Sequence, residues 1–232
     1  MTQPQLLTVD DDLAGQTYRG IPIGAAPGVH ETAFNVLRHH VPPCRVLDLG
    51  CGAGAFSQRL LDHGYDPTGV DIETKAYKAH GKVYEGDLNV GLPLAGTWTV
   101  ITAVELVEHL ENPRALFRLA ARHLAPRGWF LVTTPNIESV ASRITFLFSG
   151  RFRWFAEGHY TSSGHITPLT QWQLDQIAAE TGFTRSAVVA AATPVIGWRL
   201  RALSRLLSPL MRDAGEHDIR VCMYQQSSQG QT

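Results

Sequence analysis

An apolar, strand-like segment that runs directly into three closely spaced glycines constrains this chain more than any other feature of its sequence. Residues 46–56 read VLDLGCGAGAF, with glycine at positions 50, 52 and 54. Glycine at every second position lets the backbone turn tightly and approach a ligand without a Cβ atom in the way. The N–H groups that begin the following helix then point at that ligand. We interpret the segment as the loop of a nucleotide-cofactor site.

The same glycines permit a second interpretation. Gly50, Gly52 and Ala55 also fit the dinucleotide fingerprint G-x-G-x-x-A, and Asp71 follows Gly52 by nineteen residues, where such enzymes bind a ribose. The loop alone therefore does not separate an NAD enzyme from other nucleotide-binding proteins. The sequence has no second glycine-rich strand and no acid–base pair typical of a dehydrogenase, which disfavours NAD.

Three further segments follow the loop in a recognisable order. Residues 69–72 read GVDI, residues 86–88 read GDL, and residues 124–129 read LAPRGW. Together with the glycine loop they resemble the motifs of the class I S-adenosylmethionine (SAM) dependent methyltransferases, across about residues 28–190. Arg127 replaces the first glycine of the family's last motif, at a surface turn where the change matters little.

The resemblance implies how SAM would be held. Asp48 would lie near the ammonium group of the methionine end, Asp71 would accept both ribose hydroxyls, and Asp87 would hold the adenine amino group. An aspartate inside an apolar strand is costly without a partner, which favours a functional Asp48. Asp71 could instead cap a helix, and Cys51 is better explained as a space-filling residue than as a nucleophile. The expected cofactor residues are Asp48, Gly50, Cys51, Gly52, Gly54, Asp71, Ile72, Asp87, Leu88 and Val104.

Residues 104–110, which read VELVEHL, are the best clue to the methyl acceptor. They resemble the E-x-x-E-H segment of ubiquinone-biosynthesis-type O-methyltransferases and of small-RNA 2′-O-methyltransferases. In members of those groups this segment and a histidine from an insertion hold a divalent ion. The spacing would place its ligands on one side of a helical turn. The implied ligands are Glu105, Glu108, His109 and His165, with His159 as the rival of His165, and the ion would be Mg²⁺, Mn²⁺ or Zn²⁺.

A metal-free interpretation stays open. Many relatives keep the same Glu-His pair without a metal, and Glu108 would then stabilise a helix start while His109 acts as a general base or only packs. A base or a metal ion would meet the same need, because an alcohol or phenol is a poor nucleophile until its proton is lost or polarised. We therefore take Glu108 and His109 as the candidate catalytic residues.

The sequence thus predicts a SAM-dependent methyltransferase that O-methylates a small or lipid-like acceptor. The alternatives are N- or C-methylation of a small molecule, and a SAM-binding module without catalysis. The net charge of −1 disfavours RNA as the acceptor, although residues 113–155 carry seven arginines and only one acid, Glu138, which leaves a local basic patch.

Two segments exceed a minimal domain of this family, residues 135–168 and residues 195–213. The first interleaves aromatic residues with arginines, and a helix expected at 196–211 has a leucine stripe opposite its arginines. We expect a lid and a helix that covers the core. The alternative, for residues 143–155 or 196–211, is contact with an anionic membrane surface or an apolar acceptor.

Apolar runs alternate with helical patterns along the chain, which predicts an α/β fold with a mainly parallel sheet. The expected strands are 45–50, 67–71, 82–85, 97–103, 128–134, 184–191 and 217–224, and the expected helices are 29–40, 54–63, 73–79, 112–124, 169–181 and 196–211. The resemblance implies a single Rossmann-like domain with seven strands in the order 3-2-1-4-5-7-6, the last one antiparallel, and helices on both faces. The 232 residues, 44% of them apolar, suit one domain at 18–224, with a flexible leader at 1–17 and a disordered tail at 225–232.

Cysteine usage and hydropathy indicate the compartment. The chain has three cysteines without C-x-x-C spacing, no apolar leader segment and no run of eighteen apolar residues. These features predict a cytoplasmic protein without a signal peptide or a transmembrane segment.

Overall fold

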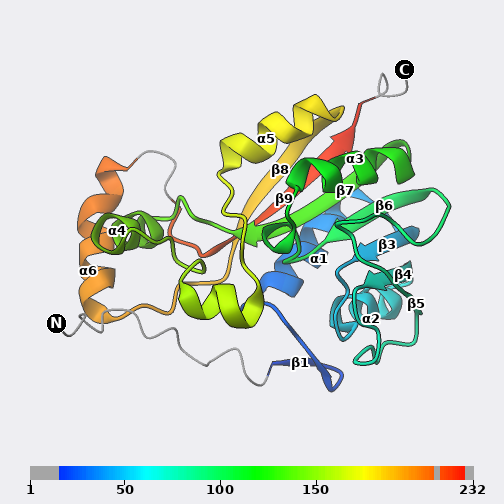
Figure 1. Ribbon diagram of the computed structural model, residues 1–232, viewed down its shortest axis with the longest axis horizontal. Helices are drawn as coiled ribbons and strands as arrows, with labels where there is room; N and C mark the ends of the chain where they lie inside the picture. The colour runs from blue at the N-terminus through cyan, green and yellow to red at the C-terminus, as the bar shows by residue number, and fades with distance from the viewer. Residues whose placement is uncertain (1–15, 212–214, 228–232) are drawn as a thin grey trace.

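The computed structural model describes residues 16–211 and 215–227, and its centre is a seven-stranded sheet with helices on both faces (Figure 1). The strands are β3 (Arg45–Leu49), β4 (Asp66–Asp71), β5 (Lys82–Glu85), β6 (Trp98–Ala103), β7 (Leu124–Pro135), β8 (Phe183–Ala191) and β9 (Ile219–Gln226). They pair in the order β5-β4-β3-β6-β7-β9-β8, and only β9 runs antiparallel to its neighbours. Numbered within the sheet, this is the order 3-2-1-4-5-7-6, which confirms the predicted fold class.

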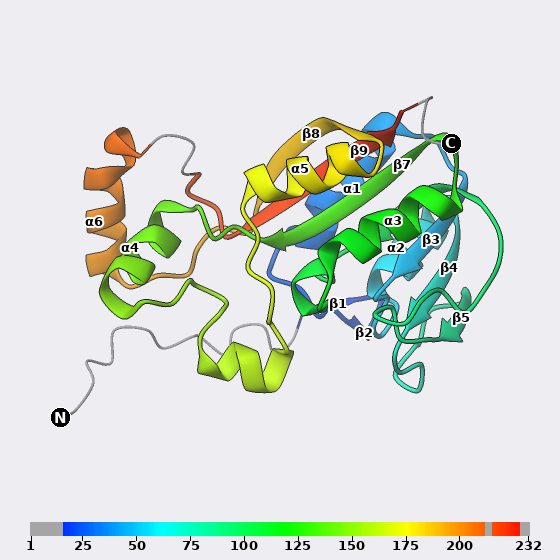
Figure 2. The same cartoon turned by 45° about the horizontal axis from the view of Figure 1, so that its top comes forward.

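Two hydrophobic cores lie on opposite faces of the sheet. One contains α1 (Val29–His40) and α2 (Ala55–Asp62), and the other contains α3 (Pro113–His123) and α5 (Gln171–Glu180), an arrangement visible in Figure 2. Successive strand residues alternate between them, so that Val46 belongs to the first core and Leu47 to the second. Because β3 to β7 are parallel, their carboxyl ends share one edge of the sheet, where ligands bind in open α/β folds.

A smaller layer of helices lies beyond this edge. α4 (Val140–Ser149) and α6 (Trp198–Leu207) pack against each other at a distance from the sheet helices (Figures 1 and 2). α6 has no buried residue, so the expectation that this helix covers the core is wrong. α6 contacts α4, and its leucines at positions 200, 203 and 207 are only partly buried. The remaining elements are β1 (Thr17–Tyr18), β2 (Ile21–Pro22), and the short helices η1 (Val107–His109), η2 (His159–Ser163) and η3 (Ser208–Leu210).

The helix expected at residues 73–79 does not form. The backbone N–H of Lys78 donates to the carbonyl of Ala53 at 2.9 Å, and the ring of Tyr77 packs over Gly54. This segment is therefore held down on the glycine loop, and the tertiary contact overrides the local helical pattern.

The ends of the expected domain also shift. β9 continues through Gln226, whose side-chain amide donates to the carbonyl of Ala121, so residues 225 and 226 belong to the sheet and not to a tail. Most of the expected leader, residues 1–15, and the end of the expected tail, residues 228–232, lie outside the described residues. Among the helices that the structure describes, none has the length and apolar character to cross a bilayer.

Candidate functional site

The glycine loop between β3 and α2 combines ligand access with tight packing. Gly52 has a φ of +51°, and no atom lies within 4 Å of the place where its Cβ would be, so this side of the loop is open. Gly54, with a φ of +90°, differs because a Cβ there would meet the Tyr77 ring at 2.8 Å. Gly52 thus leaves room for a ligand, whereas Gly54 is required by packing at the start of α2.

A cavity of about 250 Å³ opens beside this loop. Its walls include five of the ten expected cofactor residues, namely Asp48, Gly50, Cys51, Gly52 and Val104. The walls also include residues 22–25 and His30 of α1, which belong to no motif in the sequence. Burial lowers the pKa of His30 to about 4, and its Nδ1 has no hydrogen-bond partner among the described residues. The only sequence signal for this wall was a run rich in glycine and proline before α1.

Asp48 is the buried acid of the cavity. The hydroxyl of Ser57 donates to its Oδ2 at 2.6 Å, and that of Thr102 donates to its Oδ1 at 2.8 Å. Burial nevertheless raises the pKa of Asp48 to about 6, because two hydroxyl donors only partly replace lost hydration. Burial also raises the pKa of the Cys51 thiol, which favours the space-filling interpretation of that residue.

Of the five other expected cofactor residues, Gly54 is the N-cap residue of α2 and the remaining four lie at or just after the ends of β4 and β5, outside the cavity walls. Asp71 accepts the backbone N–H of Gly52 at 2.7 Å and that of Glu73 at 3.2 Å, and because no helix follows it, it is not a helix cap. Ile72 is 67% exposed, while Leu88 is buried. Asp87 accepts the N–H of Asn89 at 2.8 Å in a turn.

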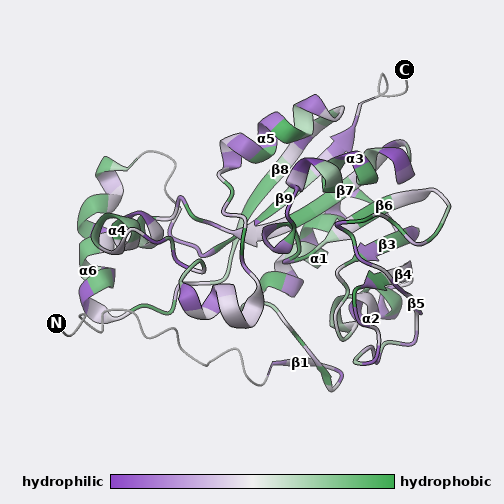
Figure 3. Cartoon of the chain, viewed as in Figure 1, coloured by the Kyte–Doolittle hydropathy of each residue, from purple (hydrophilic) through white to green (hydrophobic). Residues whose placement is uncertain are grey.

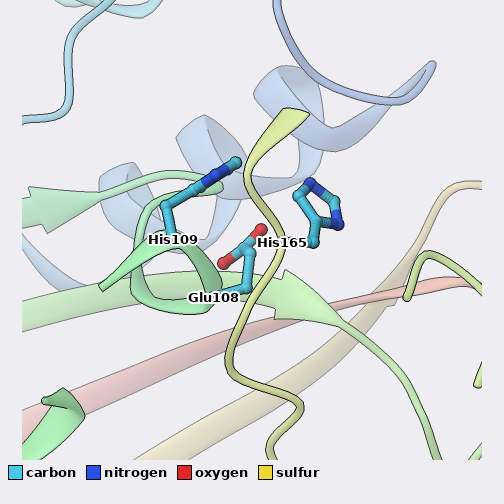
Figure 4. Close-up of side chains that lie close together, drawn as sticks. All are labelled: Glu108, His109 and His165. Carbon is cyan, nitrogen blue, oxygen red and sulfur yellow. The ribbon is translucent and has the colours of Figure 1, made fainter. Parts of the chain in front are cut away.

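Three of the four expected metal ligands converge (Figure 4). Glu108, His109 and His165 each offer one ligand atom, and these three atoms lie within 4.8 Å of one another. The carboxylate of Glu108 lies between the two imidazoles in Figure 4. Backbone hydrogen bonds explain why segments so far apart in sequence meet. The N–H groups of Ile166 and Thr167 both donate to the carbonyl of Glu108, at 3.0 and 2.9 Å.

The electrostatics of this group suit a cation. Glu108 is fully buried, and neither of its carboxylate oxygens has a hydrogen-bond partner within the described part of the chain. Burial, and then the neighbouring Glu105, raise its pKa well above the usual range. Burial lowers the pKa of His109, and burial followed by the proximity of His109 lowers that of His165 to about 4. Both imidazoles are therefore neutral at pH 7 and offer lone pairs.

A second contact orients His165. Its Nδ1 lies 2.7 Å from the carbonyl oxygen of Trp154, and only a protonated Nδ1 can donate to that oxygen. The tautomer with a proton on Nδ1 leaves Nε2 as the free acceptor, which is the usual arrangement of a ligating histidine.

Glu105 and His159 lie outside the group of three. Glu105 was expected on a helical turn with Glu108, but helical geometry begins only at Val107 and Glu105 has a φ of +51°. Its carboxylate accepts the hydroxyl of Thr133 at 2.7 Å beside the cavity, and burial raises its pKa to about 7. His159 is buried with its ring stacked 5.8 Å from that of His165.

Comparison with known families and proteins gives consistent results. A family model described as a methyltransferase domain matches residues 25–188. The ubiquinone biosynthesis O-methyltransferase of Psychrobacter arcticus is 29% identical across 62% of this chain and 61% of its own length. The protein of the same name from Bordetella avium is 33% identical across 40% of this chain and 43% of its own length. The match thus spans about half of each of these curated relatives.

Solved structures share the fold at low identity. A SAM-dependent methyltransferase from Archaeoglobus fulgidus superposes with a TM-score of 0.59 at 21% identity, covering 85% of this chain and 94% of that one. The N-methyltransferase NodS from Bradyrhizobium japonicum, in complex with S-adenosylhomocysteine, superposes with a TM-score of 0.58 at 18% identity, covering 92% and 94%. These likenesses establish the architecture.

Proposed function

The chain belongs to the methyltransferase domain family, and from this premise we propose that it transfers the methyl group of SAM to a hydroxyl of a small or lipid-like acceptor. The observation that carries the proposal is the group of Glu108, His109 and His165, of which Glu108 and His109 lie three and four residues after Glu105 in the cavity wall. The names of the curated relatives, which are O-methyltransferases, support an oxygen acceptor.

The cavity beside the glycine loop is the proposed place of the methionine end of SAM. Bare backbone at Gly52 admits the ligand closely, and the Asp48 carboxylate offers a negative charge to its ammonium group. SAM supplies a methyl group on a positively charged sulfur and needs no activation. The protein's contribution on this side is therefore alignment of the methyl group with the acceptor oxygen.

The ribose and adenine follow along the ends of β4 and β5 in this proposal. Asp71 already holds the loop through Gly52 and keeps acceptor capacity for ribose hydroxyls. Ile72 exposes two thirds of its surface at the end of β4, which is unusual for a large apolar side chain. An adenine ring packed on Ile72 would account for that exposure.

We further propose that Glu108, His109 and His165 hold a divalent ion beside the acceptor. A fully buried carboxylate without a hydrogen-bond donor is costly, and a cation between it and two neutral imidazoles would remove that cost. One carboxylate and two imidazoles are ligands that suit Zn²⁺ or Mn²⁺. When bound, such an ion lowers the pKa of an acceptor hydroxyl. Without it, the neutral His109 imidazole could accept that proton instead.

Titration of chelator-treated protein with Zn²⁺ and with Mn²⁺ by calorimetry tests this site. We expect one ion per chain, and affinity at least tenfold lower in Glu108→Gln because the charged ligand is lost. Glu111→Gln is the matched control, since Glu111 is an exposed acid just after the same segment. Both variants should bind S-adenosylhomocysteine like the wild type.

Activity separates the metal from the base. We expect SAM consumption with a panel of phenolic acceptors to stop with chelator and to return with one divalent ion. If no ion binds, or if Glu111→Gln weakens ion binding as much as Glu108→Gln does, the proposal of a metal site is wrong. Activity that is unchanged by chelator but lost in His109→Ala would establish His109 as a general base.

A further inference from the structure

α6 presents apolar residues beyond a single stripe. Leu200, Leu203 and Leu207 are partly buried and share one stripe of the helix, and α6 contacts α4. Outside that stripe Trp198 is 75% exposed and Leu206 is 71% exposed. At 100° per residue these two lie about 80° apart on the helix surface. A helix needs only one apolar side to pack onto its own protein, so the outer side calls for a separate explanation.

The neighbouring helix adds to this surface. The last turn of α4 contains Phe146, Leu147 and Phe148. All three side chains are exposed, and Phe148 is 77% exposed. Figure 3 shows hydrophobic stretches on both helices although they lie away from the sheet. We name the exposed residues of these two helices the α4–α6 surface: Phe146, Leu147, Phe148, Trp198, Leu206 and, in η3, Leu210. Monomeric proteins rarely leave so many large apolar side chains together in water.

The two segments that form the α4–α6 surface carry only positive charges. Residues 139–156 and 196–211 contain six arginines and no aspartate or glutamate. Arg199, Arg201 and Arg205 of α6 are exposed, and the guanidinium of Arg199 lies 5.3 Å from the centre of the Trp198 ring. Of the others, Arg153 is paired with Asp218. Tryptophan, leucine and arginine are typical of helices that lie in a membrane interface. α6 exposes all three residue types.

We propose that the α4–α6 surface docks the protein on an anionic phospholipid bilayer. The apolar side chains would enter the boundary between headgroups and acyl chains, and the arginines would contact lipid phosphates. A second copy of this chain is a poorer partner, because a symmetric contact would set arginines against arginines, and residues 139–156 and 196–211 contain no acid to pair with them. α6 lies outside residues 25–188, which match the family model, whereas α4 lies inside them, so only the part of the surface that α6 and η3 supply is additional to the matched domain.

Co-sedimentation with vesicles tests the proposal without any assay of activity. We expect binding to phosphatidylcholine vesicles that contain phosphatidylglycerol, much less binding to pure phosphatidylcholine, and loss of binding as salt rises. Trp198→Ala should weaken binding at least tenfold. Trp172→Ala is the matched control, because Trp172 of α5 is 68% exposed outside the α4–α6 surface. It should bind like the wild type.

Two double variants test whether vesicle binding requires the arginines of α6. Arg201→Glu/Arg205→Glu should lower partitioning onto anionic vesicles about 25-fold or more, since each arginine near such a surface contributes a factor of about five. Arg118→Glu/Arg122→Glu makes the same charge change on exposed positions of α3 and should have a much smaller effect. All variants should bind S-adenosylhomocysteine equally, which separates this proposal from the proposed activity.

Three results would overturn the proposal. One is absence of binding to anionic vesicles by the wild type. Another is an equal loss in the α3 and α6 variants, which would show that only total charge matters. The third is a dimer in lipid-free solution that Trp198→Ala dissociates, which would make a second copy the occupant of the surface.

Discussion

At the scale of one residue, the burial of the Asp48 carboxylate opposes the stability of the fold but suits the binding of a positively charged ligand. Its pKa is raised from 3.8 to about 6 by burial, and it keeps only two hydroxyl donors. A raised pKa means that the folded state holds this proton to higher pH than the unfolded chain does. The folded protein therefore becomes progressively less stable as pH rises from about 4 to about 6, and a bound ammonium group would offset that loss.

Asp48→Asn tests this cost directly. The free energy of unfolding of the variant minus that of the wild type should increase as pH rises from about 4 to 7. The change should be on the order of 2 to 3 kcal/mol, because a two-unit pKa shift corresponds to that energy. Urea unfolding at several pH values measures it, with Asp66→Asn at an exposed site as the control. A difference that does not vary with pH would contradict the assignment.

At the scale of elements, one ion pair joins the segment after α4 to Asp218, the residue directly before β9. Arg153 donates to both carboxylate oxygens of Asp218, at 3.2 and 2.7 Å, and Asp218 is almost fully buried. A bidentate pair of this kind fixes geometry as well as charge. The pair therefore fixes the position of the chain that leads from α4 to η2 and His165.

Arg153→Met should destabilise the protein by about 3 to 5 kcal/mol, because it leaves a buried carboxylate without a partner. Arg153→Met/Asp218→Asn should recover much of that loss. The matched control is Arg114→Met, which breaks an exposed pair with Glu180 and should cost less than about 1 kcal/mol. Chemical denaturation compares them, and equal losses for the two single variants would refute the structural role of the buried pair.

The sequence predicted elements well where local pattern and tertiary packing agree. The helix at residues 29–40 and the strand at 82–85 have the expected bounds. The prediction failed at residues 73–79, where contacts with the glycine loop override a helical pattern. It failed again at α6, because periodicity identifies an apolar stripe but not the element that the stripe packs against.

The same limit applies to the site. Asp48 and the glycines were visible because an acid and bare backbone are unusual at the end of an apolar strand. His165 was placed beside His109 by resemblance, and its proximity depends on backbone hydrogen bonds that sequence spacing does not encode. Glu105 was assigned to a helical turn, but its backbone adopts a left-handed conformation. His30 was missed because a single histidine on a helix gives no distinctive pattern.

At the scale of the whole molecule, topology brings the parts of the site together. The parallel strands β3, β4 and β6 end at one edge of the sheet, and the glycine loop, Asp71 and the segment of Glu105 to His109 follow those three ends. The chain that continues from β7 returns over this edge and supplies His165. α4 and α6 then extend the molecule away from the sheet (Figure 1).

The cavity beside the glycine loop and the ends of β4 and β5 together form the proposed SAM site. Calorimetric titration with S-adenosylhomocysteine should show one molecule bound per chain, with no comparable binding of NADH. Asp71→Ala should lower that affinity by about 30-fold or more, because it removes charged hydrogen bonds worth at least about 2 kcal/mol, while the exposed neighbour variant Glu73→Gln should not. Folded wild-type protein that binds NADH and does not bind S-adenosylhomocysteine would contradict the assignment of this site to SAM.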